Sequence, residues 1–117
     1  MKRILYLFLF LPLVSFSQQY VSPIGFKINE TNQNKVLNYI KYEVKKSYSA
    51  IGMDDPVTLR MMEKENLKAF KELLKVKNIS LLKSVEKSYC DIGMCNYNTI
   101  LMMYKEQSKA ATESLKW

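Results

Sequence analysis

Residues 48–53 read Tyr-Ser-Ala-Ile-Gly-Met, and residues 89–94 read Tyr-Cys-Asp-Ile-Gly-Met. The offset of 41 residues extends beyond these stretches, since residues 44–76 and 85–117 align without a gap and share 17 of 33 residues. Similarity at a fixed period indicates a repeated structural unit. The sequence therefore predicts a tandem duplication, with repeat one over about 36–76 and repeat two over about 77–117.

Both stretches combine the end of one helix with the start of the next. Glycine accepts the left-handed conformation that often follows the last helical residue. An aspartate cap followed by proline at the first helical position then favours a new helix. The residues predicted to build these two corners are Ile51, Gly52, Asp55 and Pro56 in repeat one, and Ile92, Gly93 and Asn96 in repeat two.

The apolar residues of the chain recur at helical spacing. Their pattern predicts four helices, over about 35–51, 56–76, 81–92 and 97–116, with Ser80 as the cap of the third. Asn66 is expected at the half-exposed edge of the second helix. Short connections make successive helices antiparallel, so each repeat is expected to form an αα-hairpin.

The predicted fold class is all-α, with the two hairpins packed as a four-helix bundle-like domain over 34–117. A closed bundle and an open repeat stack both fit the pattern, and the closed form is favoured because two repeats are short for a stable open array. Residues 18–33 are predicted to form an extended N-terminal lead-in, from which Ile24, Phe26 and Ile28 could lie against the bundle.

Residues 1–17 have the layout of a cleaved signal peptide. Lys2 and Arg3 precede an apolar run, and Ser15 to Ser17 offer small residues at the cleavage point. The run is shorter than the ~20 apolar residues of a spanning helix. No cysteine lies at the cleavage point for a lipid anchor. The expected location is secreted or periplasmic, with no transmembrane segment in the mature chain.

The charge of the chain is basic, at +7. Without Lys2 and Arg3, 16 basic residues face 11 acidic ones, which gives +5 for the mature chain. The charges are interleaved rather than gathered, as on a solvated helical surface. An anionic surface is the alternative partner. Nucleic acid is not expected, because no basic recognition helix stands out.

Cys90 and Cys95 are the only cysteines. In an exported protein two cysteines favour a disulfide. This one would close a loop of six residues at the second corner. The chain-entropy model assigns a loop of that length about 2 kcal/mol of stabilisation.

The methionines suggest a second hypothesis for the corners. Met53 and Met94 follow the two corner glycines, and Met94 lies between Cys90 and Cys95. Thioether and thiolate ligands suit Cu(I), and the chain has no histidine. A Cu(I) site formed by Met53, Met94, Cys90 and Cys95 is therefore an alternative to core packing by the methionines.

No pattern of catalytic residues emerges. Without histidine, acid–base work would fall to carboxylates, Lys, Tyr or Cys, and no phosphate-binding loop or nucleophile elbow is present. The candidate interaction surface follows the fourth helix, where small residues replace large ones of the second helix. It comprises Tyr97, Tyr104, Ser108 and Trp117. The sequence thus favours a small, exported, non-catalytic module that binds an unidentified protein or envelope component, with Cu(I) binding as the alternative and a small enzyme third.

Overall fold

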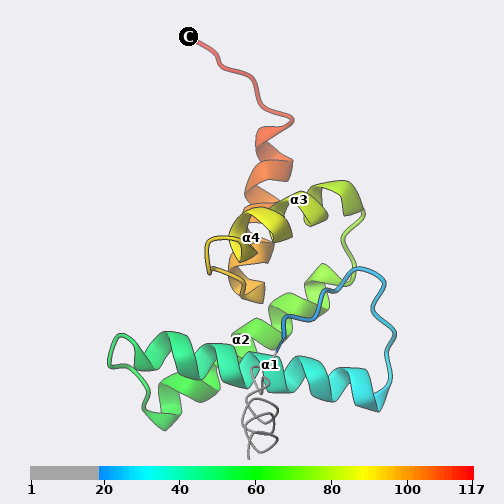
Figure 1. Ribbon diagram of the computed structural model, residues 1–117. Coiled ribbons are helices and arrows are strands. Elements are labelled where there is room, and N and C mark those ends of the chain that lie inside the picture. Colours follow the sequence, from blue (N-terminus) through cyan, green and yellow to red (C-terminus); the bar gives the residue numbers. More distant parts are fainter. Residues whose placement is uncertain (1–18) are drawn as a thin grey trace, which may run out of the picture.

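The fold is all-α, as predicted. The computed structural model describes residues 19–117, and within them it contains four helices and no strand. These are α1 (Glu30–Ser49), α2 (Pro56–Leu73), α3 (Ile79–Cys90) and α4 (Tyr97–Ala110), shown in Figure 1. The predicted signal peptide lies outside the described residues. None of the helices over 19–117 is long and apolar enough to cross a membrane.

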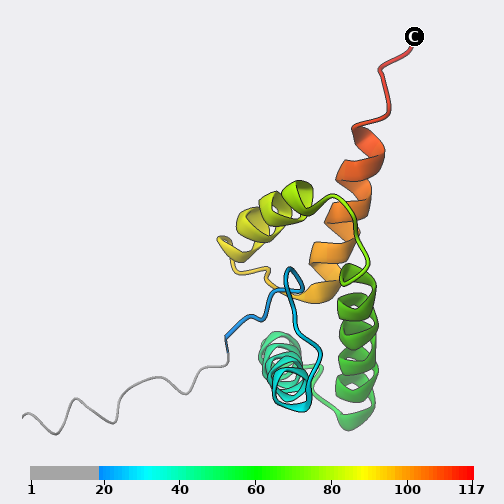
Figure 2. The same cartoon turned by 90° about the vertical axis from the view of Figure 1, so that its right-hand side faces the viewer.

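The helices form two hairpins, α1–α2 and α3–α4, which contact each other through α2 and α4. Helix α1 packs on α2, α3 packs on α4, and α2 and α4 lie against each other, whereas no Cα atom of α1 lies within 8 Å of a Cα atom of α3. The non-helical N-terminal segment, residues 19–29, passes between α1 and the α3–α4 hairpin (Figures 1 and 2). The N-terminal segment therefore forms part of the bundle-like domain. The tandem duplication of the two hairpins stays a prediction.

The two corners have the predicted geometry. Gly52 and Gly93 have positive φ angles of 73° and 80°. In both corners the following methionine N–H donates to a tyrosine carbonyl 2.8 Å away, Met53 to Tyr48 and Met94 to Tyr89. Together with the bond from each glycine N–H to the carbonyl three residues earlier, this is the Schellman motif.

The predicted caps at Asp55 and Asn96 are confirmed. The Asp55 carboxylate accepts the Thr58 N–H at 3.0 Å, and Asn96 accepts the Thr99 N–H at 2.8 Å. Hydrogen bonds from the Thr58 hydroxyl and N–H also lower the pKa of Asp55. The predicted Ser80 cap is wrong, because Asn78 accepts the Leu81 N–H and α3 begins at Ile79.

Helix α1 begins earlier than predicted. Its cap is Asn29, which accepts the Asn32 N–H at 2.8 Å, so residues 30–33 are helical and not part of an extended lead-in. The preceding segment is folded too. The Phe26 N–H donates to the Pro23 carbonyl across a turn in which Gly25 has a φ of 71°, a value suited to glycine.

Helix α4 ends at Ala110, six residues before the predicted end. Its last turn tightens, with Thr112 and Glu113 donating to the carbonyls three residues earlier. The packing explains this difference. Large buried residues hold the end of α2, whereas the equivalent end of α4 has Ala111 and Ser114, which offer little apolar surface to bury.

The core is formed by all four helices. Its buried side chains are Val36, Tyr39, Ile40, Val44, Leu59, Ala69, Phe70, Leu73, Leu82, Val85, Tyr97 and Ile100. Residues of the N-terminal segment, including Tyr20 and Phe26, pack against it. The prediction that Phe26 lies against the bundle is thus confirmed, whereas Ile28 is 71% exposed.

Candidate functional site

Five aromatic rings from four parts of the chain meet where the hairpins join. Tyr20 and Phe26 come from the N-terminal segment, Tyr39 from α1, Phe70 from α2 and Tyr97 from α4. The Tyr97 centroid lies 5.4 Å from Tyr20, 5.8 Å from Tyr39 and 4.9 Å from Phe70. Phe26 stacks edge-on against Phe70 at 5.0 Å. We name this cluster the aromatic junction.

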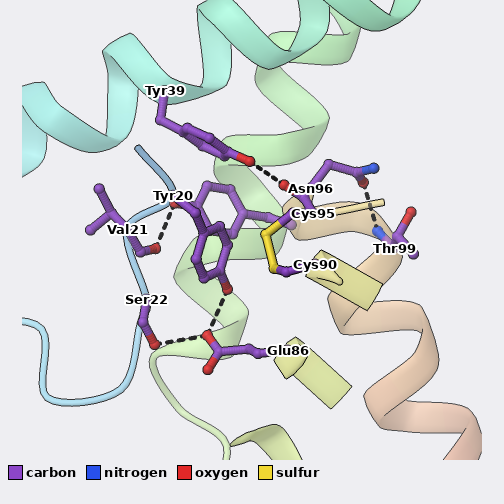
Figure 3. The surroundings of a disulfide bond; sticks show 10 residues. Tyr20, Val21, Ser22, Tyr39, Glu86, Cys90, Cys95, Asn96 and Thr99 are labelled. Atoms are coloured by element: carbon purple, nitrogen blue, oxygen red, sulfur yellow. Dashed lines mark hydrogen bonds between the residues drawn. A yellow bond between two sulfur atoms is a disulfide. The ribbon is translucent and has the colours of Figure 1, made fainter. Parts of the chain in front are cut away.

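The hydroxyl groups of the junction fix the N-terminal segment. Figure 3 shows Tyr20 and Ser22 pointing at Glu86 of α3, and both donate to the same carboxylate oxygen, at 2.6 and 2.7 Å. Tyr97 donates to the Val21 carbonyl at 2.7 Å. The segment is thereby bonded to both helices of the second hairpin.

Burial raises the pKa of three junction tyrosines. It is the main cause for Tyr20, Tyr39 and Tyr97, and the hydrogen bond to Glu86 adds to it at Tyr20. Their hydroxyls therefore stay protonated to a higher pH than the hydroxyl of a free tyrosine does, and all three donate hydrogen bonds. This arrangement suits a structural role for the junction.

The predicted disulfide is present in the structure. Cys90 and Cys95 are bonded across the second corner, with Cα atoms 4.2 Å apart. The Tyr39 hydroxyl donates to the Cys95 carbonyl, so this corner is also tied to α1 (Figure 3). The disulfide therefore stabilises a corner that contacts the first hairpin.

Asn66 is buried rather than half exposed, contrary to expectation. Its amide group donates to the Met62 carbonyl at 2.9 Å, and its oxygen accepts the Asn98 N–H at 3.2 Å. Asn98 lies in the first turn of α4, where N–H groups lack partners within the helix. Asn66 on α2 thus supplies a cap to α4.

An apolar groove of about 760 Å³ lies between the start of α1, the second half of α2 and the N-terminal segment. We name it the α1–α2 groove. Its apolar lining includes Phe26, Ile28, Leu37, Leu67, Phe70 and Leu74. Leu37 is 36% exposed and Ile28 71%. Glu30, Gln33 and Asn34 lie at its α1 side. It is an apolar surface that residues 19–117 leave uncovered.

Four lysines border the groove, namely Lys64, Lys68 and Lys71 of α2 and Lys75, two residues past the end of that helix. Spacings of four, three and four residues put them on one helix face, beside the apolar face. All four are exposed, and none belongs to an ion pair within residues 19–117. The row spans about 16 Å at 1.5 Å per residue. A long positive border therefore accompanies the apolar groove.

The predicted corner residues form the connections between helices. Ile51 and Ile92 lie at the two corners as predicted, and both are exposed, because α1 and α3 end two residues before them. Met53 and Met94 are about half exposed. The disulfide occupies both cysteine sulfurs, so a Cu(I) site with thiolate ligands would require its reduction.

The predicted interaction surface is not brought together. Tyr97 is fully buried in the junction. Tyr104 is half-buried and accepts the Asn78 N–H, whereas Ser108 and Trp117 are exposed. The groove instead lies on α1 and α2. One signal in the sequence could have indicated the groove. The apolar stripe of the second predicted helix is widened by Leu67, Phe70 and Leu74, so a single neighbouring helix cannot cover it.

No protein-family model, curated protein or solved structure matches the chain.

Proposed function

We propose that the protein is an exported, non-catalytic binding module whose α1–α2 groove takes a segment of a partner protein. The supporting observation is the groove itself. It offers uncovered apolar side chains on a chain of this size, and exposed apolar patches with polar borders are typical of interaction sites. Burying Leu37, Leu67 and Leu74 under a partner would supply the hydrophobic driving force.

The border of the groove favours one kind of segment. Four unpaired lysines in a row of about 16 Å match an elongated partner that has carboxylates beside its apolar side chains. Gln33 and Asn34 add amide groups that can bond to a peptide backbone. An elongated charged border suits a peptide better than a compact apolar ligand. The proposed partner is therefore an acidic and apolar protein segment.

The test is selection of peptides from a random library on the purified mature protein. The selected peptides should combine large apolar residues with Asp or Glu. Leu37→Asp should weaken their binding on the order of tenfold or more, as for a central interface residue. Met102→Asp is the matched control, since Met102 is exposed on α4 and does not line the groove.

Two outcomes would contradict the proposal. Peptide binding that Leu37→Asp leaves unchanged would remove the groove as the site. Binding to phosphatidylglycerol vesicles but not to peptides would instead indicate an anionic membrane surface as the partner. Lys71→Glu with Lys75→Glu should weaken peptide binding and reduce its dependence on salt.

Cu(I) binding at the corners is the second candidate, favoured by the exposure of Met53 and Met94. Titration of the reduced protein with Cu(I) tests it. Equal affinity after Met53→Leu with Met94→Leu would refute this candidate.

A further inference from the structure

The chain has a second uncovered apolar element at its other end. Residues 111–117, here named the tail, follow α4 as a non-helical stretch. Leu115 and Trp117 are 101% and 119% exposed, and neither packs against the core. Trp117 is the only tryptophan of the sequence. Large side chains such as Trp dominate protein interfaces when they are buried there.

The tail has apolar and charged side chains in an order that is complementary to the apolar lining and the lysine border of the groove. In an extended segment alternate residues share one face, so Glu113, Leu115 and Trp117 would lie together at about 7 Å steps. The two apolar side chains suit the apolar lining of the groove. Glu113 is then placed beside them with a charge opposite to Lys71 and Lys75. The tail thus offers two apolar side chains and one carboxylate on one face, with Lys116 on the opposite face.

The tail of the same molecule leads away from this site (Figures 1 and 2). Phe70 lines the groove and touches Tyr97, at the first residue of α4. The tail leaves the other end of that helix, whose 14 residues span about 21 Å. Leu115, five residues past Ala110, reaches about 17 Å at most and so cannot fold back as far as Tyr97, whereas Trp117, seven residues past Ala110, reaches about 24 Å. In Figures 1 and 2 the tail also points away from α1.

We propose that the α1–α2 groove binds the tail of a second copy of this chain. The inference rests on the proposed function of the groove and names its occupant. The groove and the tail are different surfaces, so the contact is heterologous: each copy offers one groove and one tail. Two copies that exchange tails, a ring and an open chain all use this same contact.

The test begins with the full mature chain. Its mass should increase with concentration in sedimentation experiments, and the emission of Trp117 should shift to shorter wavelength as the ring is buried. Leu37→Asp, which alters the groove, and Leu115→Asp with Trp117→Asp, which alters the tail, should each give monomers. Met102→Asp should associate like the wild type, because it lies outside both surfaces.

Mixing the two defective variants gives the decisive result. The groove variant still has an intact tail, and the tail variant still has an intact groove. Together they should form a complex of one copy each and nothing larger. A charge exchange gives a further check: Glu113→Lys should weaken association, and Lys71→Glu with Lys75→Glu should restore it.

The experiments distinguish the absence of self-association from the absence of any binding at the groove. A wild type that stays monomeric with fully exposed Trp117, but binds library peptides in a way that depends on Leu37, would overturn self-association alone. If the wild type neither associates nor binds library peptides, both proposals are overturned. Association that persists in the groove variant would also contradict the inference, because another surface would then join the copies.

Discussion

At the scale of single residues, the amide of Asn66 joins two helices by using both of its ends. Its NH₂ group bonds within α2 to Met62, and its oxygen caps the first turn of α4 at Asn98. A buried amide that is fully paired can fix the register of two packed helices. Asn66 therefore helps to set how the two hairpins meet.

Replacing Asn66 by Leu should destabilise the protein. The Asn98 N–H would lose its acceptor, and an unsatisfied buried donor costs about 1–3 kcal/mol. Unfolding in urea measures the change. Asn38→Leu is the control, because Asn38 is exposed on α1 and its substitution should change stability by no more than about 0.5 kcal/mol. Equal changes in both variants would argue against the capping role.

Burial of Asn66 could not be read from its sequence neighbourhood. It stands in an otherwise apolar stripe, and its acceptor function depends on Asn98, 32 residues away. The caps at Asp55 and Asn96 were predictable because each bonds to a residue three positions later. Local partners are visible in a sequence, and distant ones are not.

At the scale of elements, the two corners are defined by glycines in the left-handed conformation. A Cβ atom added at Gly52 would meet no atom within 4 Å, so substitution there changes the backbone energy without a clash. Gly52→Ala should lower stability by about 1 kcal/mol or more, since residues with a Cβ disfavour this conformation.

Gly52→Asn provides the matched variant for this prediction. Asparagine tolerates the left-handed region better than alanine, so it should recover part of the lost stability. Thermal unfolding of the three proteins gives the order. An alanine variant as stable as the wild type would show that the Schellman motif contributes little at this corner.

The number of helices and the corner chemistry followed from local patterns, whereas the start of α1 and the end of α4 differ most from the prediction. The polar residues Thr31 to Asn34 are typical of a helix start, but they lie inside α1, and the cap is Asn29. The helical pattern of residues 111–117 continues after α4 has ended. The apolar residues of this stretch lack a partner surface within residues 19–117, and helices in proteins depend mainly on such packing.

At the scale of the whole molecule, the aromatic junction makes the fold sensitive to alkali. The raised pKa of Tyr20, Tyr39 and Tyr97 means that the folded state keeps these protons when the unfolded state has released them. Stability is therefore fully present below the ordinary tyrosine pKa of 10.0 and falls as the pH rises beyond it.

Tyr20→Phe should make this fall less steep, because one of the three shifted groups is removed. The free energy of unfolding in urea, measured at several pH values above and below 10, tests the prediction. Asn38→Leu changes an exposed residue of α1 that carries no titratable group, and it should keep the slope of the wild type. A Tyr20→Phe slope equal to that of the wild type would contradict the role of burial.

The packing of the N-terminal segment and the position of the groove were the main features that the sequence pattern left out. The segment has no helical or alternating period, and its bonds to Glu86 and Tyr97 join distant parts of the chain. The groove forms where this segment and two helices meet. Both features arise from tertiary contacts rather than from local preference.

The position of the N-terminal segment also sets an order of events during synthesis. Tyr20 and Glu86 are 66 residues apart, and Val21 and Tyr97 are 76 residues apart. While the chain is being made from its N-terminus, α1 and α2 can pair early, but the first described residues have no complete binding site until Tyr97 has been added. The part of the domain that is synthesised first is therefore among the last to be fixed.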